Sequence, residues 1–464
     1  MNKNVEDEDY KDKISTVYSS GKRKWIYALQ PKGELYTYRT YLSYFYLVLL
    51  CAIPFIKIHG DPLFLFNLPK GIFIIFGKIF YPQDFVLLGL AMIIFILFIV
   101  IFTLAYGRIF CGWMCPQTVF LEMFFRRIEY WLEGSATRQR ANDAKAWTTE
   151  IYIRKMAKHL IFFAFSFFIA NIFLTYIIGV SELKTIMLEP VSKHLIGFIA
   201  ILIFSFVFYF VFAHAREIVC TVVCPYGRLQ SVLLDKNSIV VAYDYLRGEP
   251  RAKASKGREP GAGDCIDCDL CVQVCPTGID IRNGTQMECT NCTACIDACN
   301  MMMKKTSRPP DLIKYASENN IKEGATNRFT YRIKMYTAAL IVLIGLFTYL
   351  LGTRKTLDVT VMRVSGQILQ ENKDGTISNL YRMKIINKSG LTQPFKLIPS
   401  DPELKLHFVG KQEDSIPGKS QNEYMFFINK STEDIKTRKE LFKLKIMSGP
   451  KVMHNVKLPF IGEN

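Results

Sequence analysis

Hydrophobic residues along this chain are gathered into long blocks separated by polar segments. Five such blocks run roughly over residues 41–59, 85–106, 159–180, 195–213 and 336–352. Each is close to the length of about 20 apolar residues that a helix needs to cross the hydrocarbon core of a bilayer. Only the first block is interrupted, by Pro54 and Lys57. The pattern predicts an α-helical membrane protein with five transmembrane helices.

The final segment, residues 356–464, has a different pattern. Short apolar runs such as TLDVTVMRV, NLYRMKIIN, EYMFFIN and LFKLKIM alternate there with turn-rich stretches. This spacing predicts an all-β sandwich of about seven strands. The stretch 240–263, which contains GEPRAKASKGREPGAG, is rich in Gly, Lys and Arg and is expected to be a flexible linker.

The basic residues follow the hydrophobic blocks in a regular way. The net charge is +17, and the polar segments contain 8 Lys and Arg in residues 1–40, 2 in 60–82, 9 in 107–158, 2 in 181–194 and 17 in 215–335. Cytoplasmic loops of membrane proteins carry this excess, so the three basic segments are expected in the cytoplasm and the C-terminal domain in the periplasm. The alternation argues against nucleic acid as a partner and predicts a protein that crosses a lipid membrane several times. The polar N-terminus contains no apolar signal region, so no cleavable signal peptide is expected.

The 13 cysteines lie almost entirely in the segments expected to be cytoplasmic. The exception is Cys51, inside the first block, which is expected to be a small buried hydrophobic residue. Cysteines in a reducing compartment indicate metal ligands and not disulfides.

The strongest chemical signal is a double CxxCxxCxxxC pattern between residues 265 and 299. In bacterial ferredoxins with this spacing the first three cysteines bind one cluster and the fourth binds the other. Zinc sites favour two separated CxxC pairs instead. The pattern therefore predicts two 4Fe-4S clusters, one held by Cys265, Cys268, Cys271 and Cys299, and the other by Cys289, Cys292, Cys295 and Cys275.

Two further motifs, CGWMCP and CTVVCP, each follow a hydrophobic block and an arginine. Residues four apart on a helix share a side, and the predicted topology brings both motifs to one membrane face. We therefore expect a four-thiol site made of Cys111, Cys115, Cys220 and Cys224. Soft thiolates select copper(I), zinc or an iron-sulfur cluster, and spacing alone does not separate these.

Four other side chains are considered for this four-thiol site. Arg108, Arg216 and Arg228 would favour the thiolate form if they lie near the cysteines. His214 is considered as an extra ligand, although a hydrogen-bonded histidine at a helix end is the ordinary case.

Several redox and transport classes lose support because their motifs are missing. The sequence contains no CxxCH for covalent haem, no GxGxxG following a strand and no phosphate-binding Walker loop. Electrons must therefore come from another molecule. The expected organisation is an N-terminal segment 1–40, a membrane region 41–239 with four helices, the linker 240–263, a two-cluster ferredoxin module 264–305, a connector 306–335, a fifth helix 336–352 and the outer domain 356–464.

The order of these features resembles the cytochrome c oxidase accessory proteins called CcoG, FixG or RdxA. The resemblance covers nearly the whole chain, and GRIFCGWMCPQT is also similar to membrane ferredoxin subunits of periplasmic nitrate and nitrous-oxide reductase systems. The single outer domain separates these two groups. The stretches that carry the resemblance are YTYRTYLSYFY at 36–46, FGKIFYPQDF at 76–85, GRIFCGWMCPQTVFLE at 107–122, AREIVCTVVCPYGRLQ at 215–230 and the double cysteine motif.

The resemblance implies reduction of copper(II) to copper(I) during assembly of a cbb-type haem-copper oxidase. It also implies an immunoglobulin-like fold for residues 356–464 and a location in a bacterial inner membrane, with this domain in the periplasm. It implies copper as substrate, copper at the four CxxxCP thiols, and partners among copper chaperones or transporters and oxidase assembly components. A third cluster at those thiols is the competing assignment. A quinol-linked conduit to a redox partner and a non-catalytic assembly scaffold remain as alternatives, and the electron donor, a cytoplasmic protein or a quinol, stays open.

Overall fold

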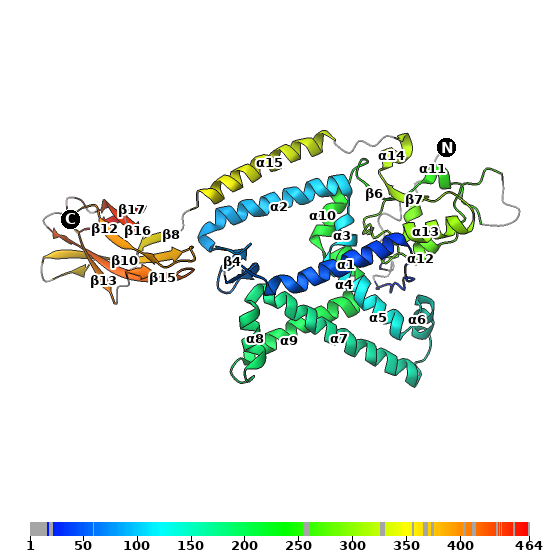
Figure 1. Ribbon diagram of the computed structural model, residues 1–464, viewed down its shortest axis with the longest axis horizontal. Helices are drawn as coiled ribbons and strands as arrows, with labels where there is room; N and C mark the ends of the chain where they lie inside the picture. Colours follow the sequence, from blue (N-terminus) through cyan, green and yellow to red (C-terminus); the bar gives the residue numbers. More distant parts are fainter. Residues whose placement is uncertain are drawn as a thin grey trace. The chain divides into compact units, whose positions relative to one another are not determined.

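A computed structural model describes residues 16–17, 22–58, 60–253, 260–324, 330–354, 357–364, 370–372, 375–401, 404–410, 414–432, 435, 437, 439–448 and 451–462. The chain divides into two compact units (Figure 1). The first comprises Met1–Lys78 and Leu88–Gly345, and the second comprises Ile79–Leu87 and Leu346–Asn464. The first unit contains every cysteine of the predicted metal sites.

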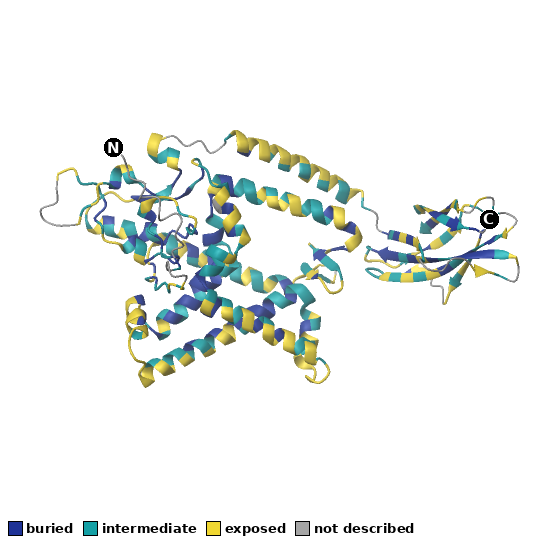
Figure 2. Ribbon diagram, turned by 180° about the vertical axis from the view of Figure 1, so that it is seen from behind, coloured by how far each residue is buried: buried dark blue, intermediate teal, exposed yellow. Residues whose placement is uncertain are grey.

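Four helices in the described part of the chain are long and apolar enough to cross a membrane. They are Pro82–Tyr106, which contains η3 (Pro82–Asp84) and α2 (Phe85–Tyr106); α7 (Thr149–Ile178); Leu195–Ala215, which joins α9 (Leu195–Phe210) and η5 (Val211–Ala215); and α15 (Tyr331–Gly352). Their apolar side chains are largely exposed, for example Phe95 at 62% and Ile341 at 66% (Figure 2). Apolar surface of this extent requires an apolar surrounding, which confirms four of the five predicted blocks as membrane-type helices.

The first predicted block forms a helix with different bounds. The helix α1 runs over Glu34–Ala52 and is followed by the short η2 (Ile53–Phe55), in which Pro54 is at the first turn. Burial on α1 is inverted relative to a soluble protein, because Arg39 is 1% exposed while Tyr41 and Val48 are 69% and 66% exposed. This inversion suits a helix that faces lipid on its apolar side and protein on its polar side.

Short strands connect α1 to α2, where the sequence pattern predicted none. They are β1 (Lys57–Ile58) paired with β2 (Asp61–Pro62), and the antiparallel sheet β3 (Phe64–Asn67), β4 (Ile72–Ile75) and β5 (Lys78–Phe80). β3 packs against α7. The segment between α7 and α9 forms the short helix α8 (Val180–Leu188).

Several short helices follow α2 and η5. After α2 come α3 (Ile109–Trp113), α4 (Pro116–Phe120), the π-helix η4 (Leu121–Phe125), α5 (Arg126–Leu132) and α6 (Ala136–Asp143); after η5 come the π-helix η6 (Val219–Val223) and α10 (Pro225–Leu233). Phe120, Phe125, Phe162 and Phe212 pack into one aromatic core that joins η4 to α7 and η5. Rings of Phe125 and Phe212 stack with centroids 4.5 Å apart.

The ferredoxin module is held at both ends by a strand pair. β6 (Val240–Tyr243) pairs with β7 (Ile313–Ala316) in antiparallel register, with Val240 opposite Ala316. The expectation of a flexible linker is therefore wrong for its first residues, because Val240, Val241 and Tyr243 are buried. The connector 306–335 also contains structure, and residues 254–259 of the linker lie outside the described residues. The module's helices are α11 (Tyr245–Gly248), α12 (Leu270–Gln273), η7 (Ile281–Asn283), α13 (Ala294–Lys305) and α14 (Glu318–Glu323).

The described part of the C-terminal segment forms two larger antiparallel sheets around one core, together with a two-stranded sheet of β11 (Gln393–Pro394) and β14 (Ser415–Ile416). The larger sheet has the order β13-β15-β10-β8, with β9 beside β10, and the smaller has the order β12-β16-β17. Tyr381 and Phe426 from the larger sheet and Leu444 from the smaller are fully buried in a common cluster. The strands are β8 (Leu357–Arg363), β9 (Gln370–Glu371), β10 (Thr376–Asn387), β11 (Gln393–Pro394), β12 (Lys396–Pro399), β13 (Lys405–Val409), β14 (Ser415–Ile416), β15 (Gln421–Ser431), β16 (Lys439–Ser448) and β17 (Lys451–Ile461).

Candidate functional site

The two ferredoxin motifs form loops with the same backbone shape. In the first loop Asp267 and Asp269, which flank Cys268, have positive φ angles of 51° and 56°. In the second loop Asn291 and Thr293, which flank Cys292, have φ angles of 55° and 66°. Asp and Asn tolerate this left-handed region better than other non-glycine residues, which explains Asp267, Asp269 and Asn291, whereas the β-branched Thr293 is unusual there. Each loop thus curls around its middle cysteine and leads into a helix, α12 or α13.

The first set of four ferredoxin cysteines lies together. The pKa of Cys299 is raised to about 12, first by burial and then by the neighbouring thiols of Cys265 and Cys268. The pKa of Cys271 is also raised to about 12, first by burial and then, against the opposing effect of Arg282, by Asp280, Cys299 and Cys268. The structure therefore brings Cys299 of the second motif to the three cysteines of the first.

The second set lines a small cavity inside the module. Cys275, Cys289, Cys292 and Cys295 line it together with residues that include Cys271 and Ile281. Burial raises the pKa of Cys289 to about 12, with Cys292 and Cys275 among the further causes. Four convergent thiols around an apolar-walled cavity fit an iron-sulfur cluster, which binds thiolates and displaces their protons.

Arg282 braces the first loop from the side. Its side chain is 7% exposed and forms ion pairs of 2.8 Å with Asp267 and 2.7 Å with Asp269, the two left-handed residues. It also pairs with Asp280 at 2.7 Å. One planar guanidinium therefore fixes both sides of Cys268.

The two CxxxCP motifs share a local geometry that differs from the expected single helix face. Cys111 lies in α3 and Cys220 in η6, whereas Cys115 and Cys224 are extended residues that precede α4 and α10. Each motif's proline occupies the first helical position, where a missing N–H has no cost. The second cysteine of each pair thus stands at the start of a new helix.

The thiols of the two motifs are close neighbours. Burial raises the pKa of Cys111 to about 11, Arg108 lowers it, and Cys115 and Cys224 raise it. Burial also raises the pKa of Cys220 to about 12, with Cys115 as the next cause. These mutual effects on the thiol pKa values indicate that the cysteines of the two motifs are neighbours, and a four-thiol metal site made of them stays a prediction.

A single-ion geometry is not formed at either kind of site. Among the described residues, no three His, Cys, Asp or Glu side chains converge closely enough to hold one metal ion. This holds for the ferredoxin cysteines too, since the four ligands of a cluster bind different iron atoms. The lack of a single-ion geometry among the described residues therefore does not decide between copper and a cluster at the CxxxCP thiols.

The three arginines considered for these thiols have different positions. Arg108 lies beside Cys111, and its guanidinium donates to the Met287 carbonyl oxygen. Arg216 is instead 2.8 and 3.0 Å from the two carboxylate oxygens of Glu129, so the expectation that it favours a thiolate is wrong. Arg228 is exposed.

The expectation of His214 as an extra ligand also differs from the structure. Its ring stacks on Phe210 with centroids 5.7 Å apart and lies 6.3 Å from the ring of His159. This location is a pocket between η5, α5 and α7, and not the thiol site.

The first CxxxCP motif packs directly on the loop that carries Cys289 and Cys292. A Cβ added at Gly112 would lie 2.5 Å from the Thr290 carbonyl oxygen and 2.8 Å from that of Asn291. Trp113 Nε1 donates to the Tyr315 hydroxyl over 3.2 Å, and this hydroxyl donates to the Asn291 carbonyl oxygen over 3.2 Å. The four-thiol site and the second cluster loop are thus in backbone contact.

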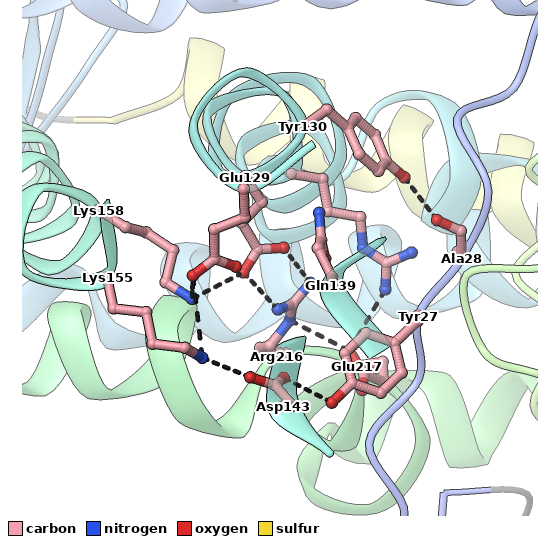
Figure 3. Close-up of polar contacts among 12 residues, drawn as sticks. Tyr27, Ala28, Glu129, Tyr130, Gln139, Asp143, Lys155, Lys158, Arg216 and Glu217 are labelled. Atoms are coloured by element: carbon pink, nitrogen blue, oxygen red, sulfur yellow. Dashed lines mark hydrogen bonds and ion pairs between the residues drawn. The ribbon is translucent and has the colours of Figure 1, made fainter. Parts of the chain in front are cut away.

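Sequence reasoning did not identify a buried ion-pair network next to the module (Figure 3). Arg126 is 3.5 Å from Glu217 and donates to the Pro276 carbonyl oxygen over 3.1 Å. Arg216 joins Glu217 to Glu129. These charged side chains come from segments far apart in the sequence. The feature of the sequence that could have pointed to them is their position next to apolar blocks.

Membrane-type helices together with two cluster-binding loops define a membrane iron-sulfur electron-transfer protein. The chain matches the description "4Fe-4S binding domain" over residues 88–135, which include Cys111 and Cys115. It matches "4Fe-4S dicluster domain" over residues 215–318 and the IG-like fold at the C-terminal of FixG over residues 347–463.

Curated relatives identify the family. Protein RdxA of Cereibacter sphaeroides is 34% identical over 336 residues, which cover 70% of this chain and 70% of RdxA. The nitrogen fixation protein FixG of Rhizobium meliloti is 35% identical over 64% of this chain and 58% of FixG. Protein RdxB of C. sphaeroides is 30% identical over 75% of this chain and 76% of RdxB. The chain belongs to the FixG/RdxA family.

Proposed function

We propose that this protein reduces copper(II) to copper(I) at the four CxxxCP thiols and supplies copper(I) for the assembly of a cbb-type cytochrome c oxidase. The observation that carries the proposal is the backbone contact between Gly112 and the Thr290–Asn291 segment. A soft thiol site that is in contact with an electron carrier can both bind the ion and have it reduced. Copper(I) is the state that thiolates prefer, so reduction and retention favour each other.

Eight cysteines of the ferredoxin module are proposed to hold two 4Fe-4S clusters, which supply single electrons when bound. The mutual effects on the thiol pKa values support one set made of Cys265, Cys268, Cys271 and Cys299. The cavity lining supports a second set made of Cys275, Cys289, Cys292 and Cys295. The positive-φ residues shape both loops, and Arg282 stabilises the first of them.

We further infer five membrane crossings in a bacterial inner membrane. The start of α1 lies at the ferredoxin module, because the backbone N–H groups of Leu35 and Tyr36 donate to the Asp297 carboxylate over 3.2 and 2.7 Å. The end of α2 lies there as well, because a Cβ at Gly107 would be 2.6 Å from the Ile239 carbonyl oxygen. A chain that starts and returns at one side of the membrane crosses it twice, so α1 and α2 are both crossings. The module is then cytoplasmic and the C-terminal domain periplasmic, where oxidase assembly components and copper chaperones or transporters could bind it.

The test uses anaerobically purified protein in detergent. The clusters are reduced, copper(II) is added, and cluster absorbance is followed while a copper(I)-specific chelator traps the product. We expect copper(I) to appear in proportion to cluster oxidation. A variant with Ser at positions 111, 115, 220 and 224 should keep the absorbance of both ferredoxin clusters and lose copper(I) formation. Equal copper(I) formation by both proteins would rule out these thiols as the site.

A third cluster at the CxxxCP thiols is the second candidate. The observation that favours it is the match to a 4Fe-4S binding domain over residues 88–135. Iron analysis separates the two assignments, because a third cluster adds four iron atoms per chain that disappear in the quadruple Ser variant. An iron content that is the same in both proteins supports copper.

A further inference from the structure

A pocket of about 350 Å³ lies where α5, α6, α7 and η5 meet the N-terminal segment. Its volume is within the range of about 300–1,000 Å³ typical of small-molecule sites. His159 and His214 belong to helices of the membrane-spanning type, whereas Glu133 directly follows α5 and Asp143 is the last residue of α6. The pocket is therefore at the boundary between membrane and cytoplasm, and neither the cysteine sites nor the proposed copper reduction uses it.

The charges around this pocket cancel. The acidic side chains are Glu129, Glu133 and Asp143; the basic ones are Lys155, Lys158 and, behind Glu129, Arg216. Lys158 is 3.0 Å from Glu133, and Asp143 accepts from Tyr27 over 2.6 Å (Figure 3). A free anion would face three carboxylates and a free cation three basic groups. The balance fits a neutral ligand that both donates and accepts hydrogen bonds.

The uncharged part of the lining is aromatic. Trp25 and Trp147 contribute their indole rings, and Phe162 adds an apolar ring. The Tyr209 hydroxyl is 2.9 Å from Nδ1 of His159. If the phenol donates its hydrogen to Nδ1, the imidazole hydrogen is on Nε2, and Nε2–H can then donate to a carbonyl oxygen of a ligand. His214 lines the pocket as well, where its ring stacks on Phe210 and lies 6.3 Å from the ring of His159.

Two routes of contact connect the pocket to the ferredoxin module. Glu129, Arg216, Glu217 and Arg126 form a chain of ion pairs that ends on the Pro276 carbonyl oxygen, next to Cys275. The N-terminal segment gives the second route: Trp25 and Tyr27 line the pocket, while a Cβ at Gly278 would be 3.0 Å from Ile26, and the Leu29 N–H donates to the Gln273 carbonyl oxygen over 2.9 Å. The N-terminal segment therefore contacts the pocket on one side and the residues between Cys271 and Cys275 on the other.

We propose that this pocket binds the head group of a membrane quinol, which is the electron donor of the protein. A quinol is neutral, aromatic and dissolved in the bilayer, and it carries two hydroxyl groups. On oxidation its two O–H bonds break, the protons pass to His214 and the Glu133 carboxylate, and two electrons leave for the two clusters, one to each. The released product is the quinone. The proposal concerns the donor and does not require copper to be the acceptor.

Binding is tested first, on the full chain in detergent, by titration with menadione and quenching of tryptophan fluorescence. The chain has four tryptophans, of which Trp25 and Trp147 line the pocket. We expect saturable quenching that weakens in a Trp147→Phe variant and is kept in the matched control Trp131→Phe, whose side chain is 76% exposed outside the pocket. Quenching that does not saturate, or that is the same in both variants, would overturn the proposal.

Electron donation is tested with menadiol under anaerobic conditions by following the cluster absorbance. In the double variant His159→Phe/His214→Phe, which keeps aromatic rings, we expect cluster reduction to slow by about tenfold or more. The control His194→Phe changes a histidine that contacts Glu189 outside the pocket and should reduce at the wild-type rate. Reduction by dithionite serves as the test of intact clusters. Equal rates with menadiol in all three proteins would contradict the proposal. Copper(II) reduction by dithionite-treated protein tests the copper site independently of the quinol.

Discussion

At the scale of single residues, two glycines make the contact between the cysteine motifs and their surroundings. Gly112 places its backbone against Thr290 and Asn291, and Gly227 leaves room for the Arg108 guanidinium 2.8 Å from where a Cβ would be. Both glycines stand inside or directly after a CxxxCP motif. Their function is to allow close backbone approach, which no larger residue permits.

We predict that Gly112→Ala slows copper(I) formation several-fold while both clusters remain. The added methyl group meets backbone atoms at 2.5 Å and 2.8 Å, so α3 and the cluster loop must move apart, at a cost of about 1–3 kcal/mol. The measurement is the rate of copper(I) trapping after dithionite reduction. Gly89→Ala is the control, because a Cβ there has no neighbour within 4 Å. The same rate in both variants would show that the contact does not matter for electron transfer.

The cysteines were the residues that the sequence could predict, because cluster ligands need a fixed spacing along the chain. Arg216 is only four residues from Cys220 in the sequence, and closeness in sequence does not place the two side chains together in space. The bend between η5 and η6, where Arg216 has a φ of 49°, turns its side chain to Glu129. Buried ion pairs between distant segments leave no periodic signal by which they could be recognised.

At the scale of elements, the N-terminal segment 22–29 acts as a connector between α5–α7 and the ferredoxin module. It has no helix or strand longer than an isolated bridge between Val17 and Arg23. Tyr130 donates to the Ala28 carbonyl oxygen over 2.9 Å, and Tyr27 donates to Asp143. The sequence predicts only a polar, cytoplasmic segment here. The contacts that attach it are made by individual side chains, which leave no recognisable pattern along the chain.

The attachment of this segment should depend on pH. Burial raises the pKa of Asp143, but hydrogen bonds from Lys155 and Tyr27 outweigh it and hold the pKa below its usual value of 3.8. A lowered pKa in the folded state stabilises the attachment above pH 3.8, and this stabilisation is lost as the pH falls further through the folded value. Limited proteolysis of the N-terminus between pH 3 and 6 should therefore accelerate at the acid end. In Asp143→Asn cleavage should be faster than wild type at pH 6 and change less with pH; a wild-type profile in this variant would contradict the assignment.

The crossing by α1 can be tested by labelling with a membrane-impermeant maleimide in intact cells. Leu68→Cys lies between β3 and β4, at a side chain that is 68% exposed. If α1 crosses the membrane, this cysteine is periplasmic and reacts in intact cells, as Leu391→Cys in the C-terminal unit should. Lys145→Cys, in an exposed loop, should react only after lysis. Protection of position 68 in intact cells would mean that α1 does not cross.

At the scale of the whole molecule, the two compact units have separate hydrophobic cores. The core of the second unit comes from alternating residues of two sheets, with Leu444 and Ile446 fully buried. The alternation made this unit recognisable as all-β from sequence. The number of strands was not predictable, because pairs as short as β11 and β14 are set by their partners and not by local pattern.

We predict that Leu444→Ala destabilises the second unit by about 2–5 kcal/mol without affecting the clusters. The leucine is fully buried, so its removal leaves a cavity. Pulse proteolysis of the full chain in increasing urea measures the stability of the C-terminal unit, and visible absorbance measures the clusters. Leu391→Ala, at a side chain that is 74% exposed in the same unit, is the control. Loss of cluster absorbance in Leu444→Ala would show that the two units do not fold independently.

The pairing of β6 with β7 has a consequence for how such proteins can change over time. The strand that enters the ferredoxin module and the strand that leaves it lie side by side, with Val241 opposite Tyr315. Whatever is inserted between them begins and ends at the same place, so the length of the insert can change without moving the two chain ends that join it to the membrane region. The contacts that Asp297, Thr290 and Pro276 make with the membrane region restrict this freedom of length to the parts of the module that do not touch that region.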